Sequence, residues 1–250
     1  MTGFILFQNA VLRVFRHLDE ALAVSGLIWI GILIIQILTY NFIDMEILRS
    51  LGIAYLSSQD RILLFLSNLV IALGSCWIAV EWHIFALRSE RPTSAFPKLR
   101  GGQTVSYLLL TMGLILLIGL VISLFFVVLF SILGTGFAQS FGMLFLIVVM
   151  ALPATFLFLR LSPVLPSVAL GEKLPLRAAW NATQPHSALL LQAAVLLIVF
   201  FIFIQAVVLL FGAGILGLLV ELVVGWFFLM INVSLLSSIY ELAMKGHLND

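Results

Sequence analysis

Six long apolar stretches dominate this chain and limit what it can fold into. They occupy residues 21–43, 62–87, 104–133, 139–161, 188–211 and 215–240. Each is long enough to cross a bilayer core of about 30 Å, which takes about 20 helical residues. Backbone groups in lipid have no water to bond, and the stretches lack the alternation of barrel strands, so each predicts a helix. We therefore expect an all-α fold, a polytopic transmembrane bundle of six spans.

The composition leaves lipid as the solvent of this bundle. The 250 residues are 63% hydrophobic and 9% charged, whereas a soluble domain carries about 25% charged residues. We therefore expect residues 1–250 to form a single integral membrane domain whose first partner is the lipid bilayer. The net charge of +1 gives no reason to expect a nucleic-acid partner. The single cysteine, Cys76, cannot form an intrachain disulfide.

The distribution of basic residues predicts the orientation. One side of the predicted membrane carries Arg13, Arg16, Arg88, Arg91, Lys98, Arg100, Arg160, Lys173, Arg177 and Lys245, and the other carries Arg49 and Arg61. Cytoplasmic loops are enriched in Lys and Arg. We therefore expect a multi-pass protein of the bacterial inner membrane with both termini in the cytoplasm. The first apolar run is too long for a secretion signal and lacks a small-residue cleavage site, which predicts a retained span.

Two shorter segments predict helices that lie in the headgroup layer. Residues 4–19 place Phe4, Phe7, Val11, Val14, Phe15 and Leu18 at helical spacing, with Gln8, Asn9, Arg13 and Arg16 largely on the other side. The alternative is that this segment simply begins a bent first helix. Residues 174–183 predict a short helix with Pro175 in its first turn, which ends before Pro185. This helix would press Leu176 and Trp180 onto the membrane surface.

Glu81, Trp82 and His83 stand together near the cytoplasmic end of the second predicted span. Positions 81 and 83 are about 200° apart on a helix, so their side chains do not converge as a catalytic dyad. Glu81 shares a face with Arg88, two turns further on. Anchoring at the membrane edge and a functional role with another helix both remain open for these residues.

Four polar residues are predicted to lie in one layer, about 10 Å inside the outer boundary. They are Gln36, Asn68, Gln205 and Glu221. Gln205 and Glu221 fall at equal depth on either side of a turn near residues 212–214, which predicts a hydrogen bond between them. The layer fits hydrogen bonding between helices, and it also fits a site for a polar solute or a proton.

The sequence offers little for catalysis. It contains no G-x-x-x-x-G-K, G-x-S-x-G, H-E-x-x-H or C-x-x-C motif. Its four histidines lack metal-ligand spacing. We expect no enzyme, no catalytic residue, no metal site and no cofactor.

Two segments resemble a known group of membrane proteins. They are "EWHIFALRSERP" (81–92) and "RLSPVLPSVALGEKLPLRAAWNAT" (160–183). Both resemble uncharacterised bacterial six-span proteins that are distantly related to the membrane domain associated with some glycerophosphodiester phosphodiesterases. The resemblance implies a shared architecture and no reaction, because the phosphodiesterase chemistry belongs to a separate soluble domain. It adds a candidate cytoplasmic-side motif of Glu81, Trp82, His83, Arg88, Arg160 and Trp180.

These features favour a non-catalytic accessory or scaffold protein. Its partners are expected to be other membrane proteins, further copies of itself, or lipids that it organises. The alternative is a small transporter or lipid-handling protein that uses the polar layer around Glu221.

Overall fold

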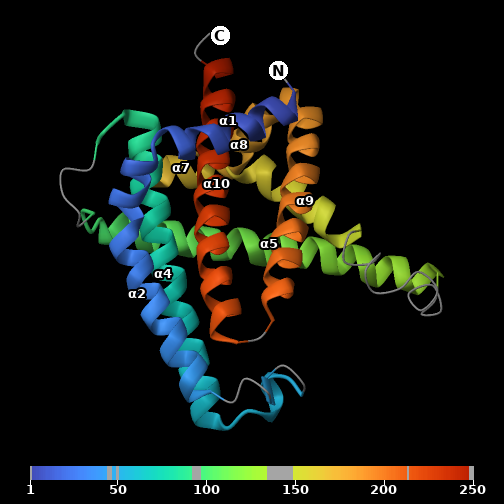
Figure 1. Ribbon diagram of the computed structural model, residues 1–250. Coiled ribbons are helices and arrows are strands. Elements are labelled where there is room, and N and C mark those ends of the chain that lie inside the picture. The colour runs from blue at the N-terminus through green and yellow to red at the C-terminus, as the bar shows by residue number, and fades with distance from the viewer. Residues whose placement is uncertain are drawn as a thin grey trace.

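The computed structural model describes residues 2–43, 47–48, 51–91, 97–133, 149–212 and 214–247. These residues form helices and contain no strand, which confirms the all-α prediction (Figure 1). In chain order the helices are α1 (Gly3–Arg16), α2 (Leu18–Phe42), η1 (Ile53–Tyr55), α4 (Ser58–Arg88), α5 (Gly101–Leu133), the helix Val149–Leu161, α7 (Val164–Ala169), α8 (Leu176–Thr183), η2 (Gln184–His186), α9 (Ser187–Phe211) and α10 (Ile215–His247).

Five helical segments in the described part of the chain are long and apolar enough to cross a membrane. They are α2, α4, α5, the run from α8 through α9, and α10. The predicted span 139–161 is described only from Val149 to Leu161, which covers about 20 Å at 1.5 Å per residue. Residues 139–148 and Arg49 lie outside the described residues. The structure therefore indicates a multi-pass membrane protein with five such segments.

The ends of the long helices have local causes. Ser57 begins α4 by accepting a hydrogen bond from the Asp60 N–H, and Ser89 ends it in the left-handed conformation, with φ of 57°. The turn between α9 and α10 falls where the sequence predicted it. The last helix continues to His247 rather than ending near residue 240. Glu241 accounts for part of this extension, because it bonds Arg13 of α1 at 2.9 Å.

Helix α1 lies across α9 and α10 at the end of the bundle where both termini lie (Figure 1). We call this end the α1 end. The face that α1 buries consists of Gly3, Leu6, Ala10 and Val14. The phenylalanines expected to define its apolar face are partly directed elsewhere, since Phe4 and Phe15 are exposed. Gly3 and Ala10 are small enough to let the backbone of α1 approach its neighbours closely, which explains why this face of α1 is buried and not the one with Phe4 and Phe15.

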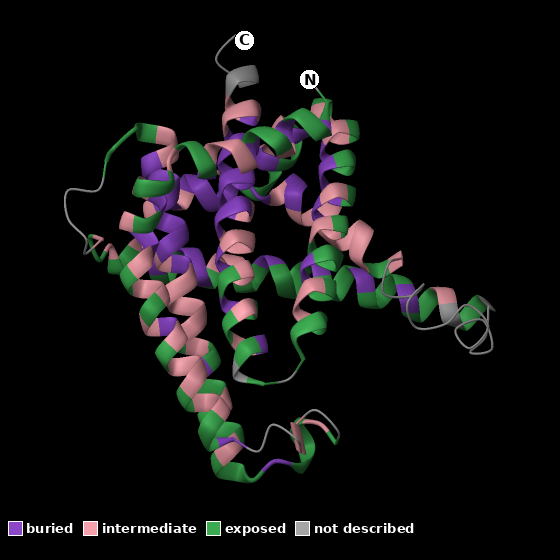
Figure 2. Ribbon diagram, in the orientation of Figure 1, coloured by how far each residue is buried: buried purple, intermediate pink, exposed green. Residues whose placement is uncertain are grey.

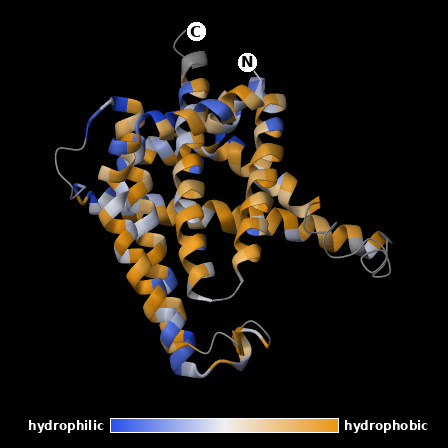
Figure 3. Cartoon of the chain, viewed as in Figure 1, coloured by the Kyte–Doolittle hydropathy of each residue, from blue (hydrophilic) through white to orange (hydrophobic). Residues whose placement is uncertain are grey.

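Burial is concentrated at the α1 end, as the purple segments of Figure 2 show. The largest side chains buried there include Trp82, Leu159, Leu165, Leu190 and Leu235. Away from this end the helices become exposed, and Figure 3 shows that these exposed segments are hydrophobic. A hydrophobic exposed surface of this extent requires lipid as its surroundings.

Helix α5 crosses the other long helices at a steep angle (Figure 1). One stripe of it is buried, at Tyr107, Leu114, Ile118, Ile122 and Phe126, with steps of roughly one or two turns. The outer part of this stripe packs against the helix Val149–Leu161. Much of the remaining surface of α5 is apolar and exposed.

The docking of α1 can be tested at Gly3. A Cβ atom there would overlap Gln192 Cβ and lie 2.5 Å from Leu189 O, so α1 would have to move away from α9. We expect Gly3→Ala to lower the free energy of unfolding by about 1–3 kcal/mol, measured by thermal denaturation in detergent. Gly26→Ala is the control, because a Cβ at Gly26 meets no atom within 4 Å. Equal stability of the Gly3 variant and the wild type would contradict this docking.

Candidate functional site

A buried hydrogen-bonded cluster around His83 joins three helices at the α1 end. His83 of α4 places Nδ1 2.8 Å from Ser237 Oγ of α10 and Nε2 3.1 Å from the Tyr107 hydroxyl of α5. Ser237 Oγ donates its own hydrogen to Val233 O. The His83 Nδ1–H therefore donates to Ser237, and Nε2 accepts from Tyr107. This pattern satisfies a neutral imidazole on both sides.

Burial separates this cluster from the surroundings of the protein. A serine hydroxyl next to an imidazole is the pair that nucleophilic catalysis uses. Here His83 and Ser237 are both 0% exposed, so a substrate has no route to the serine oxygen. In the cluster, His83, Tyr107 and Ser237 satisfy one another's hydrogen-bonding groups, which would otherwise be buried without a partner.

Glu81 pairs with the chain that precedes α5. Its Oε1 lies 3.1 Å from Arg100 Nε, and Arg100 Nη2 lies 3.4 Å from Glu90. The shared helix face of Glu81 and Arg88 does not bring these two together. Arg88 lies two turns further along α4, at its last residue, where other acceptors are nearer.

Those acceptors belong to the end of α7 and the loop after it. Arg88 Nη2 donates to Leu170 O at 2.8 Å and lies 3.7 Å from Glu172. The Tyr240 hydroxyl of α10 donates to the same Glu172 carboxylate at 2.6 Å. Arg88 and Glu172 thus join α4 to α10 through the short helix α7.

Arg160 holds α8 against the end of the helix Val149–Leu161. Its guanidinium lies over the Trp180 ring, 3.8 Å from the ring centroid, and its Nη2 donates to Trp180 O at 2.8 Å. Thr183 donates to Arg160 O at 3.0 Å. Trp180 is therefore partly covered by the arginine instead of lying wholly on the membrane surface. Stacking combined with hydrogen bonding is a use of Arg that Lys cannot reproduce.

The six residues of the candidate motif thus belong to separate clusters. Trp82 is fully buried in the core, and its indole Nε1 has no hydrogen-bond partner among the described residues. The partners Tyr107, Arg100, Glu172 and Ser237 were missed by the sequence interpretation. His83 and Ser237 are 154 positions apart, and no local pattern links residues at that separation.

Three of the four predicted outer-layer residues line one cavity, which we call the polar pocket. Gln36 of α2, Asn68 of α4 and Glu221 of α10 contribute to it, and its cavity volume is about 240 Å³. Of the described residues that line it, Glu221 alone is acidic or basic by residue type, apart from the phenol of Tyr40. The Gln36 Oε1 atom is buried without a partner among the described residues. Thr39 and Ser67, which also line the pocket, bond each other at 2.8 Å.

Gln205 lies outside this group. Its side chain is exposed, while its neighbour Ile204 is buried. Successive residues point about 100° apart on a helix, so Gln205 faces away from the bundle. Within the described part of the chain, no hydrogen bond joins Gln205 to Glu221.

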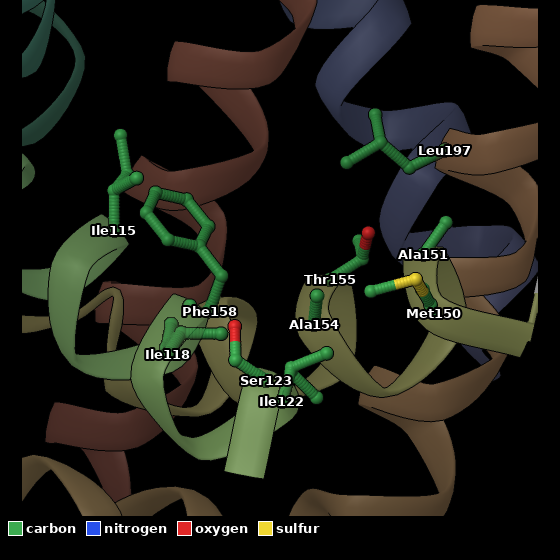
Figure 4. Close-up of a pocket in the computed structure, with 11 residues that line it drawn as sticks. Ile115, Ile118, Ile122, Ser123, Met150, Ala151, Ala154, Thr155, Phe158 and Leu197 are labelled. Carbon is green, nitrogen blue, oxygen red and sulfur yellow. The ribbon is translucent and has the colours of Figure 1, made fainter. Parts of the chain in front are cut away.

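A second cavity is apolar and lies between α5 and the helix Val149–Leu161 (Figure 4). We call it the α5 groove. Its cavity volume is about 610 Å³. The side chains drawn in Figure 4 are mostly apolar, with hydroxyl groups at Ser123 and Thr155. Ile118 and Phe158 approach each other from the two helices (Figure 4). A concave apolar surface of this size suits a hydrocarbon chain or an apolar side of another helix.

The His83 cluster provides a stability test. Tyr107→Phe removes the hydrogen that His83 Nε2 accepts, and His83→Leu removes both bonds of the imidazole. Each change should lower the free energy of unfolding in detergent by about 1–3 kcal/mol, because a buried polar atom is left unpaired. The double variant should lose less than the sum. Tyr55→Phe, at an exposed tyrosine, is the control. Strictly additive losses would show that His83 and Tyr107 do not interact.

Comparison with known proteins leaves the function to be argued from these sites. No group of three or more His, Cys, Asp or Glu side chains that could hold a metal ion occurs within the described part of the chain. No protein-family model, curated protein or solved structure matches the chain.

Proposed function

We propose that this chain is a non-catalytic accessory or scaffold protein of the bacterial inner membrane. It packs against other membrane proteins or organises lipid. The observation that carries the proposal is the α5 groove, an apolar cavity of about 610 Å³ lined by a helix that the rest of the chain covers along one stripe.

Concavity separates this groove from the rest of the apolar surface. Lipid chains cover any convex apolar surface, so the exposed faces of α2 and α9 call for no protein partner. A groove can be filled more completely by an inserted side chain or helix than by mobile lipid, because close packing and not hydrophobicity drives association inside a bilayer. Within the described part of the chain, the groove includes Gly119, which leaves room for such an insertion.

The polar groups at the α1 end support a non-catalytic role. Glu81, His83, Arg88 and Arg160 each bond a partner on another segment, and these contacts use their hydrogen-bonding capacity for packing. The proposed topology has six crossings with both termini in the cytoplasm, in keeping with the bacterial six-span proteins that the chain resembles. The Arg13–Glu241 contact, which joins the first and last helices, supports placing both termini on one side.

A groove-filling variant tests the scaffold proposal. Gly119→Leu should fill part of the α5 groove, because Gly119 lines the groove and a Cβ there meets no atom within 4 Å. Purification in mild detergent followed by mass spectrometry should find stable companions with the wild type and several-fold fewer with this variant. Gly113→Leu is a matched control, since Gly113 has the same open surroundings on α5 and does not line the groove. A wild-type protein that repeatedly purifies alone and monomeric would refute the scaffold.

The polar pocket favours a second candidate, a small transporter or lipid-handling protein. An ionisable residue inside a membrane domain is a default candidate for function. Glu221 shares its cavity with Gln36 and Asn68, and none of the described residues that line it is basic. An acceptor-rich cavity of this kind suits a solute that donates hydrogen bonds or carries positive charge.

Single cysteines test this candidate and the orientation together. In a variant without Cys76, cysteines at 36, 55, 98, 205 and 221 are treated on intact spheroplasts with a membrane-impermeant thiol reagent. We expect rapid labelling at 55 and none at 98, because these residues lie on opposite sides of the proposed membrane. A water-accessible pocket predicts labelling at 36 and 221, with position 205 as the unlabelled control outside the pocket. Inert cysteines at both 36 and 221 would argue against a solute pathway, and labelling at 98 would overturn the orientation.

A further inference from the structure

A third cavity lies at the α1 end and is lined by basic side chains. We call it the basic pocket. Its lining residues are Arg13, His17, Phe85, Ala86, Ser89 and Arg91, and its cavity volume is about 210 Å³. The residues come from α1, from the junction between α1 and α2, and from the end of α4 with the residues that follow it. Among the described residues that line it, the three with ionisable side chains, Arg13, His17 and Arg91, are all basic.

The fold holds these groups in place. The His17 ring packs edge-on against Phe85, with ring centroids 5.4 Å apart. Arg13 is held from the other side by Glu241 of α10 at 2.9 Å. Ser89 closes α4 in the left-handed conformation, which turns the chain as it leads to Arg91. Packed elements therefore hold Arg13 and His17, while Arg91 follows the fixed end of α4.

Nearby carboxylates leave several donors available. Glu241 takes Arg13 Nη2, but Arg13 Nη1 is buried without a hydrogen-bond partner among the described residues. Glu20 lies 3.6 Å from Arg91 Nε and 3.8 Å from His17 Nδ1. Both distances are longer than a good hydrogen bond, so these contacts with Glu20 leave N–H groups available. A buried guanidinium N–H without an acceptor is a costly feature, so turning the Arg13 guanidinium toward an acceptor bound in the pocket would be favourable.

We propose that the basic pocket binds a phosphate group. Arginine presents its donors in a planar fork that matches phosphate oxygens, and a charge-assisted bond of this type is stronger than a neutral one. Glu241 and Glu20 offset the charges of Arg13 and Arg91. The site would therefore recognise a phosphate mainly through the geometry of its hydrogen-bond donors and less through net positive charge. The pocket is large enough for one phosphate group with part of its substituent.

The phosphate can come from a lipid headgroup or from free phosphate. In the proposed orientation the α1 end lies at the cytoplasmic headgroup layer, where lipid phosphates are concentrated. The site does not depend on the scaffold proposal, because none of its residues lines the α5 groove.

The test measures how added ligands change the thermal stability of the purified protein in a non-ionic detergent. The probes are phosphatidylglycerol, diacylglycerol with the same acyl chains, and inorganic phosphate. We expect phosphatidylglycerol to raise the unfolding midpoint and diacylglycerol to have little effect. If inorganic phosphate alone reproduces the rise, the source is free phosphate; if only phosphatidylglycerol does so, the source is the lipid headgroup. A rise of equal size with diacylglycerol would overturn the proposal, because the acyl chains would then carry the binding, and so would the absence of any rise.

Charge-removing variants locate the binding. Arg91→Gln should weaken the apparent affinity roughly tenfold, and it should fold normally because Arg91 is 78% exposed. Arg13→Gln should weaken it at least as much, although this variant also loses the contact with Glu241. Arg16→Gln is the matched control, since Arg16 lies on the same helix and does not line the pocket. Equal losses in Arg91→Gln and Arg16→Gln would show a diffuse surface effect and overturn the site.

Discussion

A polar side chain that is buried loses water as a partner and is stabilised by a hydrogen-bond partner within the chain. The His83 cluster shows this condition fully met. Both ring nitrogens of His83 are hydrogen-bonded. Ser237, which bonds one of them, donates its own hydroxyl hydrogen to the backbone carbonyl of Val233. A buried imidazole with one nitrogen unpaired would cost about as much as a lost hydrogen bond. The three helices that supply these partners are thereby fixed at one end of the bundle.

This condition also explains why the molecule is packed unevenly. The ionic and hydrogen-bonded contacts of Arg13, Glu81, Arg88 and Arg160 all lie toward the α1 end, and the largest buried side chains gather there (Figure 2). The opposite parts of the helices carry mostly apolar side chains, which lipid solvates as well as protein does. Fewer polar contacts join those parts, the Thr39–Ser67 hydrogen bond being one, and the α5 groove and the polar pocket lie among them.

Much of the fold could be predicted from the sequence because bilayer thickness sets a minimum length for every apolar helix that crosses it. The positions of α2, α4, α5 and α9 follow directly from the apolar runs. The partners of the polar residues could not be predicted in this way, since Arg13 and Glu241 are 228 positions apart and depth counting gives no rotation about the helix axis. Gln205 shows that depth alone does not predict contact. It was predicted to lie at the same depth as Glu221, but its side chain is exposed and faces away from the bundle.

Arg13 connects the basic pocket to the packing of the whole α1 end. One nitrogen of its guanidinium faces Glu241 of α10, and the other is the unpartnered donor. A phosphate bound by Arg13 in the basic pocket would fix the guanidinium plane and so strengthen the contact between α1 and α10. Ligand binding and α1 docking would then share one side chain, and by linkage each would stabilise the other. A basic residue that first serves to hold a surface helix on a membrane bundle can in this way make the stability of the bundle sensitive to the phosphate groups around it.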